Sequence, residues 1–348
     1  MTQLSYLTPT AVPVSDRRTR ILVMGIILLL AGALCVLILG FMSYFLLLFR
    51  RRAMSGPSFP IKYVLMPLLL YAVAGAALLW MGMGAVLRRR WARPVVLAIA
   101  WPWLMVGTVG VVIAIIAIVH VRTILAGSSQ TAAYSPFMFM GVFLASGVYF
   151  FFPLSLILVF QSQEVQATLE FYDPRPRWTD DKPVPVLCLC VYLLLTAVTF
   201  AMNSRGVFPF FSGLITGAQG VVAVCLIVGT LLLAMILSLR LHIEGWLLSV
   251  AMLILLPAST LVTLLRISPM EMYRAMGLSD DDLFMAERMG YAQSGSTVAW
   301  IVIGAGIGIG FAIVARRSFF APAGFSVVMP PSPAETPPMP RSFPPENS

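Results

Sequence analysis

The chain alternates long, uninterrupted apolar runs with short polar links, and both of its ends are polar. A helix needs about 20 apolar residues to cross the roughly 30 Å of hydrocarbon in a bilayer. Eight runs reach or approach that length with no Asp, Glu, Lys or Arg inside them, and none shows the two-residue alternation of a membrane β-barrel. The pattern therefore predicts an all-α, polytopic transmembrane helical bundle of about eight spans, at residues 21–49, 63–87, 94–121, 137–160, 184–202, 208–239, 246–265 and 298–315.

The same pattern divides the chain into three regions. We expect a polar N-terminal arm over residues 1–20, the transmembrane bundle over 21–320 and a disordered, proline-rich tail over 321–348. Within the bundle, two links are long enough to fold outside the membrane, at residues 161–183 and 266–297.

Composition sharpens this interpretation. Of the 348 residues, 59% are hydrophobic and 11% are charged, whereas soluble domains carry about 25% charged residues. The net charge of +9 would also fit a nucleic-acid-binding protein. The basic residues flank apolar runs, however, so we expect contact with anionic lipid headgroups and none with nucleic acid.

The distribution of Lys and Arg predicts an orientation. With eight spans, the side that holds the N-terminus has 14 of these residues and the other side has 9. Since basic loops remain in the cytoplasm, both termini are predicted to be cytoplasmic. An alternative with seven spans makes residues 63–87 re-entrant and places the N-terminus outside.

The link between the second and third runs is the most basic part of the chain. Its sequence, LRRRWARPVV over residues 87–96, places four arginines around one tryptophan. Guanidinium groups bind lipid phosphates, and tryptophan favours the membrane interface. We interpret this hairpin as a candidate lipid anchor, formed by Arg88, Arg89, Arg90, Trp91 and Arg93.

The loop over 161–183 is the most polar link. Residues 161–172 are predicted to continue the fourth helix as an amphipathic segment, with an apolar face that lies along the membrane surface. A stiff, proline-rich segment follows, because a residue before proline avoids the helical region. It is a candidate docking loop for a partner, carried by Asp173, Arg175, Arg177, Trp178, Asp180 and Asp181.

A magnesium-dependent, lipid-modifying enzyme is the weaker alternative for this loop. Such chemistry needs several converging carboxylates to hold the metal. Asp180 and Asp181 are adjacent, and no second acidic cluster stands in another loop on that side. We therefore expect no metal there.

The two links together resemble signatures of uncharacterised multi-pass membrane proteins of bacteria. The resemblance lies in RRRWARP and DPRPRWTDDKPVPVL, and it covers about residues 80–107 and 161–190. It implies a bacterial inner membrane and brings no activity, substrate or catalytic residue.

The apolar runs contain little that points to chemistry. Ion-coupled transporters usually keep an ionisable group within the membrane, and these runs have no Asp, Glu, Lys or Arg. His120 and His242 are expected at opposite membrane faces, which excludes a shared haem. Cys188 and Cys190 lack the further ligands of a zinc site. We expect no catalytic constellation and no cofactor.

A permease for a neutral or weakly polar solute is the main alternative function. Prolines interrupt several runs, and broken helices are where permeases form their sites. Hydroxyl and amide side chains that could line such a path are Thr196, Thr199, Asn203, Ser259, Thr260 and Thr263.

Outside the membrane, residues 268–290 predict two short helices. Ser268, with Glu271 three residues later, is typical of a capping box, and Gly277 suits the residue after a helix end. Ser279 is predicted to cap the second helix. This pair, the loop 161–183 and the proline-rich tail are the candidate partner surfaces.

The sequence thus predicts an integral membrane protein of a bacterial inner membrane that is not an enzyme. A scaffold or accessory component of a membrane complex fits it best, and the permease is the alternative.

Overall fold

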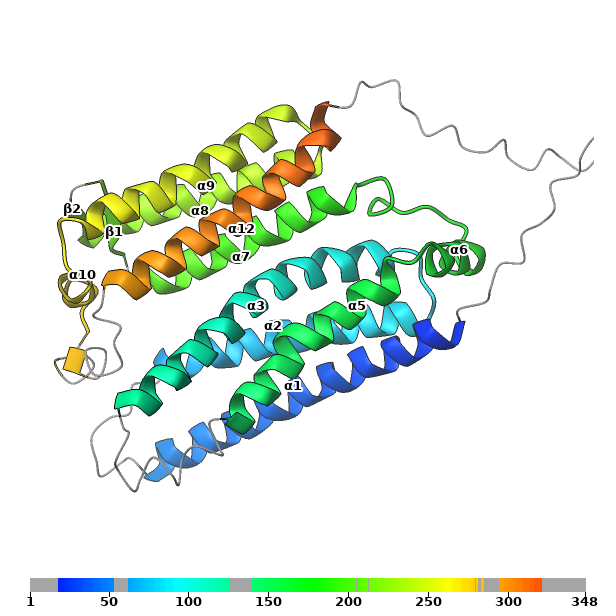
Figure 1. Ribbon diagram of the computed structural model, residues 1–348, viewed down its shortest axis with the longest axis horizontal. Helices are drawn as coiled ribbons and strands as arrows, with labels where there is room; N and C mark the ends of the chain where they lie inside the picture. Colours follow the sequence, from blue (N-terminus) through cyan, green and yellow to red (C-terminus); the bar gives the residue numbers. More distant parts are fainter. Residues whose placement is uncertain are drawn as a thin grey trace, which may run out of the picture.

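Eight long apolar helices dominate the computed structural model of the protein (Figure 1). Each is long and apolar enough to cross a membrane, which confirms the predicted all-α, multi-pass bundle. The structure describes residues 18–52, 62–124, 139–204, 206–211, 213–278, 280, 283–284 and 294–320. The tail 321–348 and most of the arm 1–20 lie outside these residues, and residues 18–20 already belong to the first helix.

The first half of the chain builds one group of helices with its own core. The buried residues that unite it include Leu28, Met81, Val96 and Phe160. The fourth span covers Phe139–Phe160 and contains a π-helical turn. The elements are α1 (Arg18–Arg52), α2 (Lys62–Val86), α3 (Ala92–Ile124), the π-helical η2 (Gly147–Phe151), α5 (Phe152–Phe160) and α6 (Gln163–Tyr172).

The second half builds a second group, which meets the first along α3 and α7. Its core unites buried residues such as Leu189, Leu193, Leu231 and Ala312. Figure 1 shows the two groups as separate layers. The elements are α7 (Val184–Asn203), β1 (Phe208–Phe210), β2 (Gly213–Ile215), α8 (Gly217–Leu239), α9 (Ile243–Leu264), α10 (Pro269–Ala275) and α12 (Ser294–Phe320).

The path of the chain places both described ends at the same end of the bundle. α2 is a continuous helix of 25 residues that runs antiparallel along α1 (Figure 1). It does not turn back, so the seven-span alternative with a re-entrant 63–87 does not describe this fold. The start of α1 and the finish of α12 therefore lie at the end that also holds α6 (Figure 1).

The sixth span is shorter than the predicted 208–239. Residues 208–210 and 213–215 pair as two antiparallel strands, in which Phe208 faces Ile215 and Phe210 faces Gly213. Pro209 has no N–H for a helix, and Gly217 begins α8 with a φ of 65°, which favours glycine. The hydroxyl of Ser259 in α9 donates to Pro209 O at 2.7 Å and accepts from Phe211 N at 3.1 Å. Side-chain hydrogen bonding thus replaces part of the helical ladder.

The amphipathic segment after the fourth span is also different from the prediction. The helix of the fourth span ends with Gln161 as its C-cap. Ser162 then caps a separate helix by accepting from Val165 N at 3.2 Å. Val165 and Leu169 pack into the core of the first half. The apolar face of α6 therefore covers protein and does not lie along the membrane surface.

The predicted N-cap role of Ser268 is confirmed. Ser268 caps α10 by accepting from Glu271 N at 3.2 Å. Gly277 follows the helix with a φ of 72°, as expected for the residue after a helix end. Most of the second predicted helix of this pair, including Ser279, lies outside the described residues.

Candidate functional site

The arginine hairpin and the polar loop, predicted as separate sites, lie against each other. We call residues 87–93 together with 163–183 the arginine platform. The contact joins positions as far apart in sequence as Arg90 and Asp173, whose backbone N and Oδ2 are 3.3 Å apart. The platform occupies the end of the bundle where α2 finishes and α7 begins (Figure 1).

A tight turn at the end of α2 aims the arginines at the loop. Arg89 N donates to Gly84 O at 2.8 Å, and Arg88 N donates to Ala85 O at 3.0 Å. This pair of hydrogen bonds is a Schellman motif, in which the central residue adopts the left-handed conformation and is usually glycine. Arg88 holds that place with a φ of 51°. The left-handed backbone costs a non-glycine residue about 1 kcal/mol.

Arg90 fastens the loop to the hairpin. Its Nη2 is 3.4 Å from Glu170 Oε1 on α6, and its Nε is 3.4 Å from Asp180 Oδ2 in the loop. Asp173, at the end of α6, accepts from the backbone N of Arg90 and lies 4.0 Å from Arg89 Nη1. One guanidinium thus bridges a helix and a loop that would otherwise be free to separate.

The loop is ordered around the same carboxylates. Asp180 Oδ2 accepts from Arg177 N at 2.8 Å, and Asp180 N donates to Arg177 O at 2.9 Å. The side chains of Asp173 and Asp180 are only 9% and 8% exposed. Of the acids predicted to dock a partner, these two face inward, and Asp181 remains exposed.

Three acids of the platform, Glu170, Asp173 and Asp180, contact arginines. Among the described residues, no group of three His, Cys, Asp or Glu could hold a metal ion. Asp180 directs Oδ2 to both Arg90 and the Arg177 backbone. The arrangement therefore fits a structural ion-pair network.

Two further arginines of the predicted lipid anchor also contact protein. Arg93 Nε donates to Phe160 O at 3.0 Å, at the last residue of α5. The guanidinium of Arg88 lies over the ring of Tyr172, 4.5 Å from its centroid, a cation–π geometry. Within the part of the chain that the structure describes, the buried Nε of Arg88 has no hydrogen-bond partner.

Trp91, the fifth residue of the anchor, stacks on Trp80 of α2. Their ring centroids are 4.4 Å apart and the rings are inclined by 24°. Gly84 leaves room for this stack, because a Cβ built there would lie 2.7 Å from two ring carbons of Trp91. A glycine one helical turn from Trp80 is thus a requirement of the aromatic pair.

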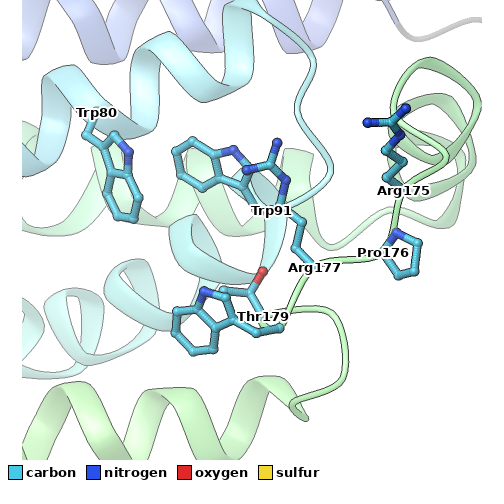
Figure 2. A pocket seen from close by; sticks show the side chains of 7 residues that line it. Trp80, Trp91, Arg175, Pro176, Arg177 and Thr179 are labelled. Carbon is cyan, nitrogen blue, oxygen red and sulfur yellow. The ribbon is translucent and has the colours of Figure 1, made fainter.

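The stack forms one wall of a pocket of about 590 Å³ (Figure 2). The loop supplies the other walls, including Thr179, which is buried. Among the described residues, the buried Thr179 Oγ1 has no hydrogen-bond partner. The lining residues are Trp80, Trp91, Arg175, Pro176, Arg177, Trp178 and Thr179.

Four of the hydroxyls predicted to line a permease path donate hydrogen bonds to backbone carbonyls. Thr196, Thr260 and Thr263 each donate to the carbonyl four residues earlier, at 2.8, 2.9 and 2.9 Å. Ser259 holds the β-hairpin. These bonds satisfy the hydroxyls within their own helices or against the hairpin.

The remaining candidate ligands are dispersed. Cys188 and Cys190 direct their sulfur atoms to Leu97 O and Met235 O, at 3.8 and 3.6 Å. His242 Nδ1 lies 4.0 Å from Glu244 Oε2, and both side chains are exposed. The side chain of His120 lies outside the described residues.

Comparison with protein-family models, with curated proteins and with solved structures finds no match for this chain.

Four residues that take part in the site were not among the predicted site residues. They are Trp80, Glu170, Tyr172 and Thr179, which join the site through contacts between distant segments. Trp80 left a signal, since an aromatic residue near the end of a span favours the interface.

Proposed function

We propose that this protein is a non-enzymatic scaffold or accessory component of a membrane complex in the bacterial cytoplasmic membrane. The arginine platform is its cytoplasmic docking surface for a protein partner. The observation that carries the proposal is the fastening of the loop by Arg90, which contacts Glu170 and Asp180 at 3.4 Å each. A loop that is already ordered loses less conformational entropy when a partner binds.

The outward side of the platform supports a docking role. Phe171 is 81% exposed and Trp178 is 62% exposed. Asp181, which stands between Trp178 and the start of α7 in the sequence, is also exposed. Aromatic residues beside charged ones are typical of the residues that contribute most to protein interfaces. The inward side, in contrast, is occupied by the ion pairs of Arg89 and Arg90.

Charge supports the orientation. The end of the bundle that carries the platform holds Arg88, Arg89, Arg90, Arg93, Arg175, Arg177, Lys182, Arg240, Arg316 and Arg317. Such an excess of basic residues is typical of the cytoplasmic side.

The test is purification of the full chain from its native membrane in mild detergent, followed by quantitative mass spectrometry. We expect a stoichiometric protein companion. The double variant Phe171→Ser, Asp181→Lys changes only exposed side chains, and we expect it to retain at least tenfold less of that companion.

A matched control comes from the turn between α8 and α9, which lies at the same end of the bundle (Figure 1). Glu244→Lys reverses a side chain that is 72% exposed, and it should keep the companion. Equal retention by both variants would remove the platform from the interaction. Magnesium-dependent turnover of a lipid diphosphate by the purified chain, lost in Asp181→Asn, would replace the scaffold with a lipid-modifying enzyme.

A further inference from the structure

We propose that the pocket between the Trp80–Trp91 stack and the loop is a binding site for the phosphate group of one anionic phospholipid. This site shares Trp178 with the protein-docking side, but its other lining residues are Trp80, Trp91, Arg175, Pro176, Arg177 and Thr179, and it contains neither Phe171 nor Asp181. The ligand chemistry is a phosphate diester that carries acyl chains.

The pocket is lined by two cations of the platform, Arg175 and Arg177, whose side chains are not committed to an acid. Arg89 and Arg90 pair with acids, and Arg93 bonds a carbonyl. In contrast, neither Arg175 nor Arg177 has a side-chain hydrogen bond or ion pair within the described part of the chain. Guanidinium groups bind phosphate oxygens with two parallel hydrogen bonds. Two such groups in one pocket wall therefore favour a phosphate.

The backbone keeps these two arginines at fixed places. They flank Pro176, whose ring fixes its φ, and Asp180 holds the backbone N of Arg177 at 2.8 Å. Figure 2 shows the Arg177 side chain extending toward Trp91, with Arg175 on the other side of Pro176. A bound phosphate would not need to order the loop first.

Thr179 is an independent observation that indicates a ligand. The residue is 3% exposed and lines the pocket, and its Oγ1 has no partner among the described residues. Buried hydroxyls are nearly always hydrogen-bonded, so an isolated one next to a pocket calls for a ligand acceptor. A phosphate oxygen would be such an acceptor once the hydroxyl, which is itself buried, rotates toward the pocket.

The surroundings favour a lipid over a soluble phosphate. Trp80 belongs to a stripe along α2 that is exposed at steps of three and four residues. This stripe runs along a membrane-spanning helix and reaches the pocket at Trp80, so acyl chains can lie against it while the headgroup meets the loop. Its exposed members are Val73, Ala76, Trp80, Met83 and Leu87.

The test is native mass spectrometry of the full chain in a non-ionic detergent, titrated with palmitoyl-oleoyl phosphatidylglycerol. We expect one tightly retained molecule, and weaker retention of phosphatidylcholine with the same chains. Each arginine near an anionic surface contributes about fivefold in affinity. The double variant Arg175→Gln, Arg177→Gln should therefore bind about thirtyfold more weakly, and Arg175→Lys, Arg177→Lys should recover part of that loss.

Two more variants separate the site from general attraction to charge. Arg240→Gln removes an exposed arginine at the same end of the bundle, and it should leave the retained lipid unchanged. Thr179→Val is nearly isosteric. It should raise the melting temperature of the lipid-free protein by removing the isolated hydroxyl, and it should weaken lipid retention at least threefold.

Competition identifies the source of the phosphate. Glycerol 3-phosphate and inorganic phosphate should not displace the lipid at concentrations where dihexanoyl phosphatidylglycerol displaces part of it. Displacement by inorganic phosphate at those concentrations would overturn the lipid assignment. Unchanged retention in the Arg175→Gln, Arg177→Gln variant, or an equal loss in Arg240→Gln, would overturn the site itself.

Discussion

The α2–α3 and α8–α9 hairpins lie at the same end of the bundle and turn in the same way (Figure 1). Arg88 has a φ of 51° in the first, and Leu241 has a φ of 61° in the second. The second turn repeats the Schellman hydrogen bonds, from His242 N to Leu237 O at 3.1 Å and from Leu241 N to Ser238 O at 2.9 Å. Backbone geometry alone therefore does not make the first hairpin a site.

The side chains around the turns make the difference. The first hairpin places Arg90 between Glu170 of α6 and Asp180 of the loop. It also stacks Trp91 on Trp80. At the second, His242 and Glu244 are exposed and contact each other at 4.0 Å. A site forms at the turn that faces another segment, because only there do charged groups find partners out of water.

The two hairpins also differ in the atoms that surround a glycine close to each turn. Gly245 of α9 faces backbone, and a Cβ there would lie 2.6 Å from Leu237 C. Gly84 of α2 faces the ring of Trp91. The second hairpin uses glycine to bring helices together, and the first uses it to seat an indole.

The largest expected effect is that of Gly245→Ala. The new methyl group would meet backbone atoms, which cannot move without separating α8 from α9. We expect a loss of about 3 kcal/mol, at the upper end of the range for overpacking. Denaturation of the detergent-solubilised chain with sodium dodecyl sulfate measures it, and an unchanged midpoint would show that the helices separate easily.

Arg90→Ala should follow, with a loss of about 2 kcal/mol. This is less than the roughly 3–5 kcal/mol of a fully buried pair, because the Arg90 side chain is 27% exposed. The variant leaves Asp180 without its cation and frees the loop. Trypsin reports this, since Arg177 precedes Trp178 whereas Arg175 and Lys182 precede prolines. Cleavage after Arg177 should accelerate in Arg90→Ala and remain slow in the control Arg240→Ala.

Gly84→Ala should cost about 1.5 kcal/mol, within the usual range for overpacking. Here the neighbour is a side chain, so Trp91 can rotate away from the new methyl group. The stack with Trp80 would then open and the pocket would change shape. Lipid retention should fall in this variant but persist in Gly110→Ala, where the added methyl group would meet no atom within 4 Å.

The smallest expected effect compares glycine with alanine at the two left-handed residues. Arg88→Gly should be more stable than Arg88→Ala by about 1 kcal/mol, because glycine adopts a positive φ without strain. Leu241→Gly against Leu241→Ala should show the same difference. Unequal differences, measured by thermal unfolding in detergent, would mean that the two turns are not equivalent in backbone energy.

Hydropathy was enough to predict the bundle, because eight apolar runs are a property of the chain itself. Local patterns were also sufficient for Ser268 and Gly277, whose roles depend on neighbours within a few residues. The β-hairpin at 208–215 was missed, although Pro209 and Gly217 were visible signals against a continuous helix. Hydrophobicity alone cannot distinguish a helix from a short strand.

The candidate site was predicted in parts but not as a whole. The arginines and the aspartates were identified as two separate sites, one for lipid and one for a partner. Their contact depends on the packing of α3, α5 and α6, which brings Arg90 to residues about 80 or more positions away. A single sequence does not show that residues so far apart along the chain lie close together in space. The role of Thr179 in the pocket could not have been predicted, because it depends on a hydrogen bond that the buried side chain lacks.

The β1–β2 hairpin has a consequence for how the protein fits its bilayer. At 1.5 Å per residue, a single helix over 208–239 would be about 48 Å long, far more than the roughly 30 Å of hydrocarbon. With the first residues folded back, α8 keeps 23 residues, or about 34 Å. Ser259 supplies the hydrogen bonds that this backbone loses. The sixth span therefore matches the thickness of the membrane without the steep tilt that a longer helix would need.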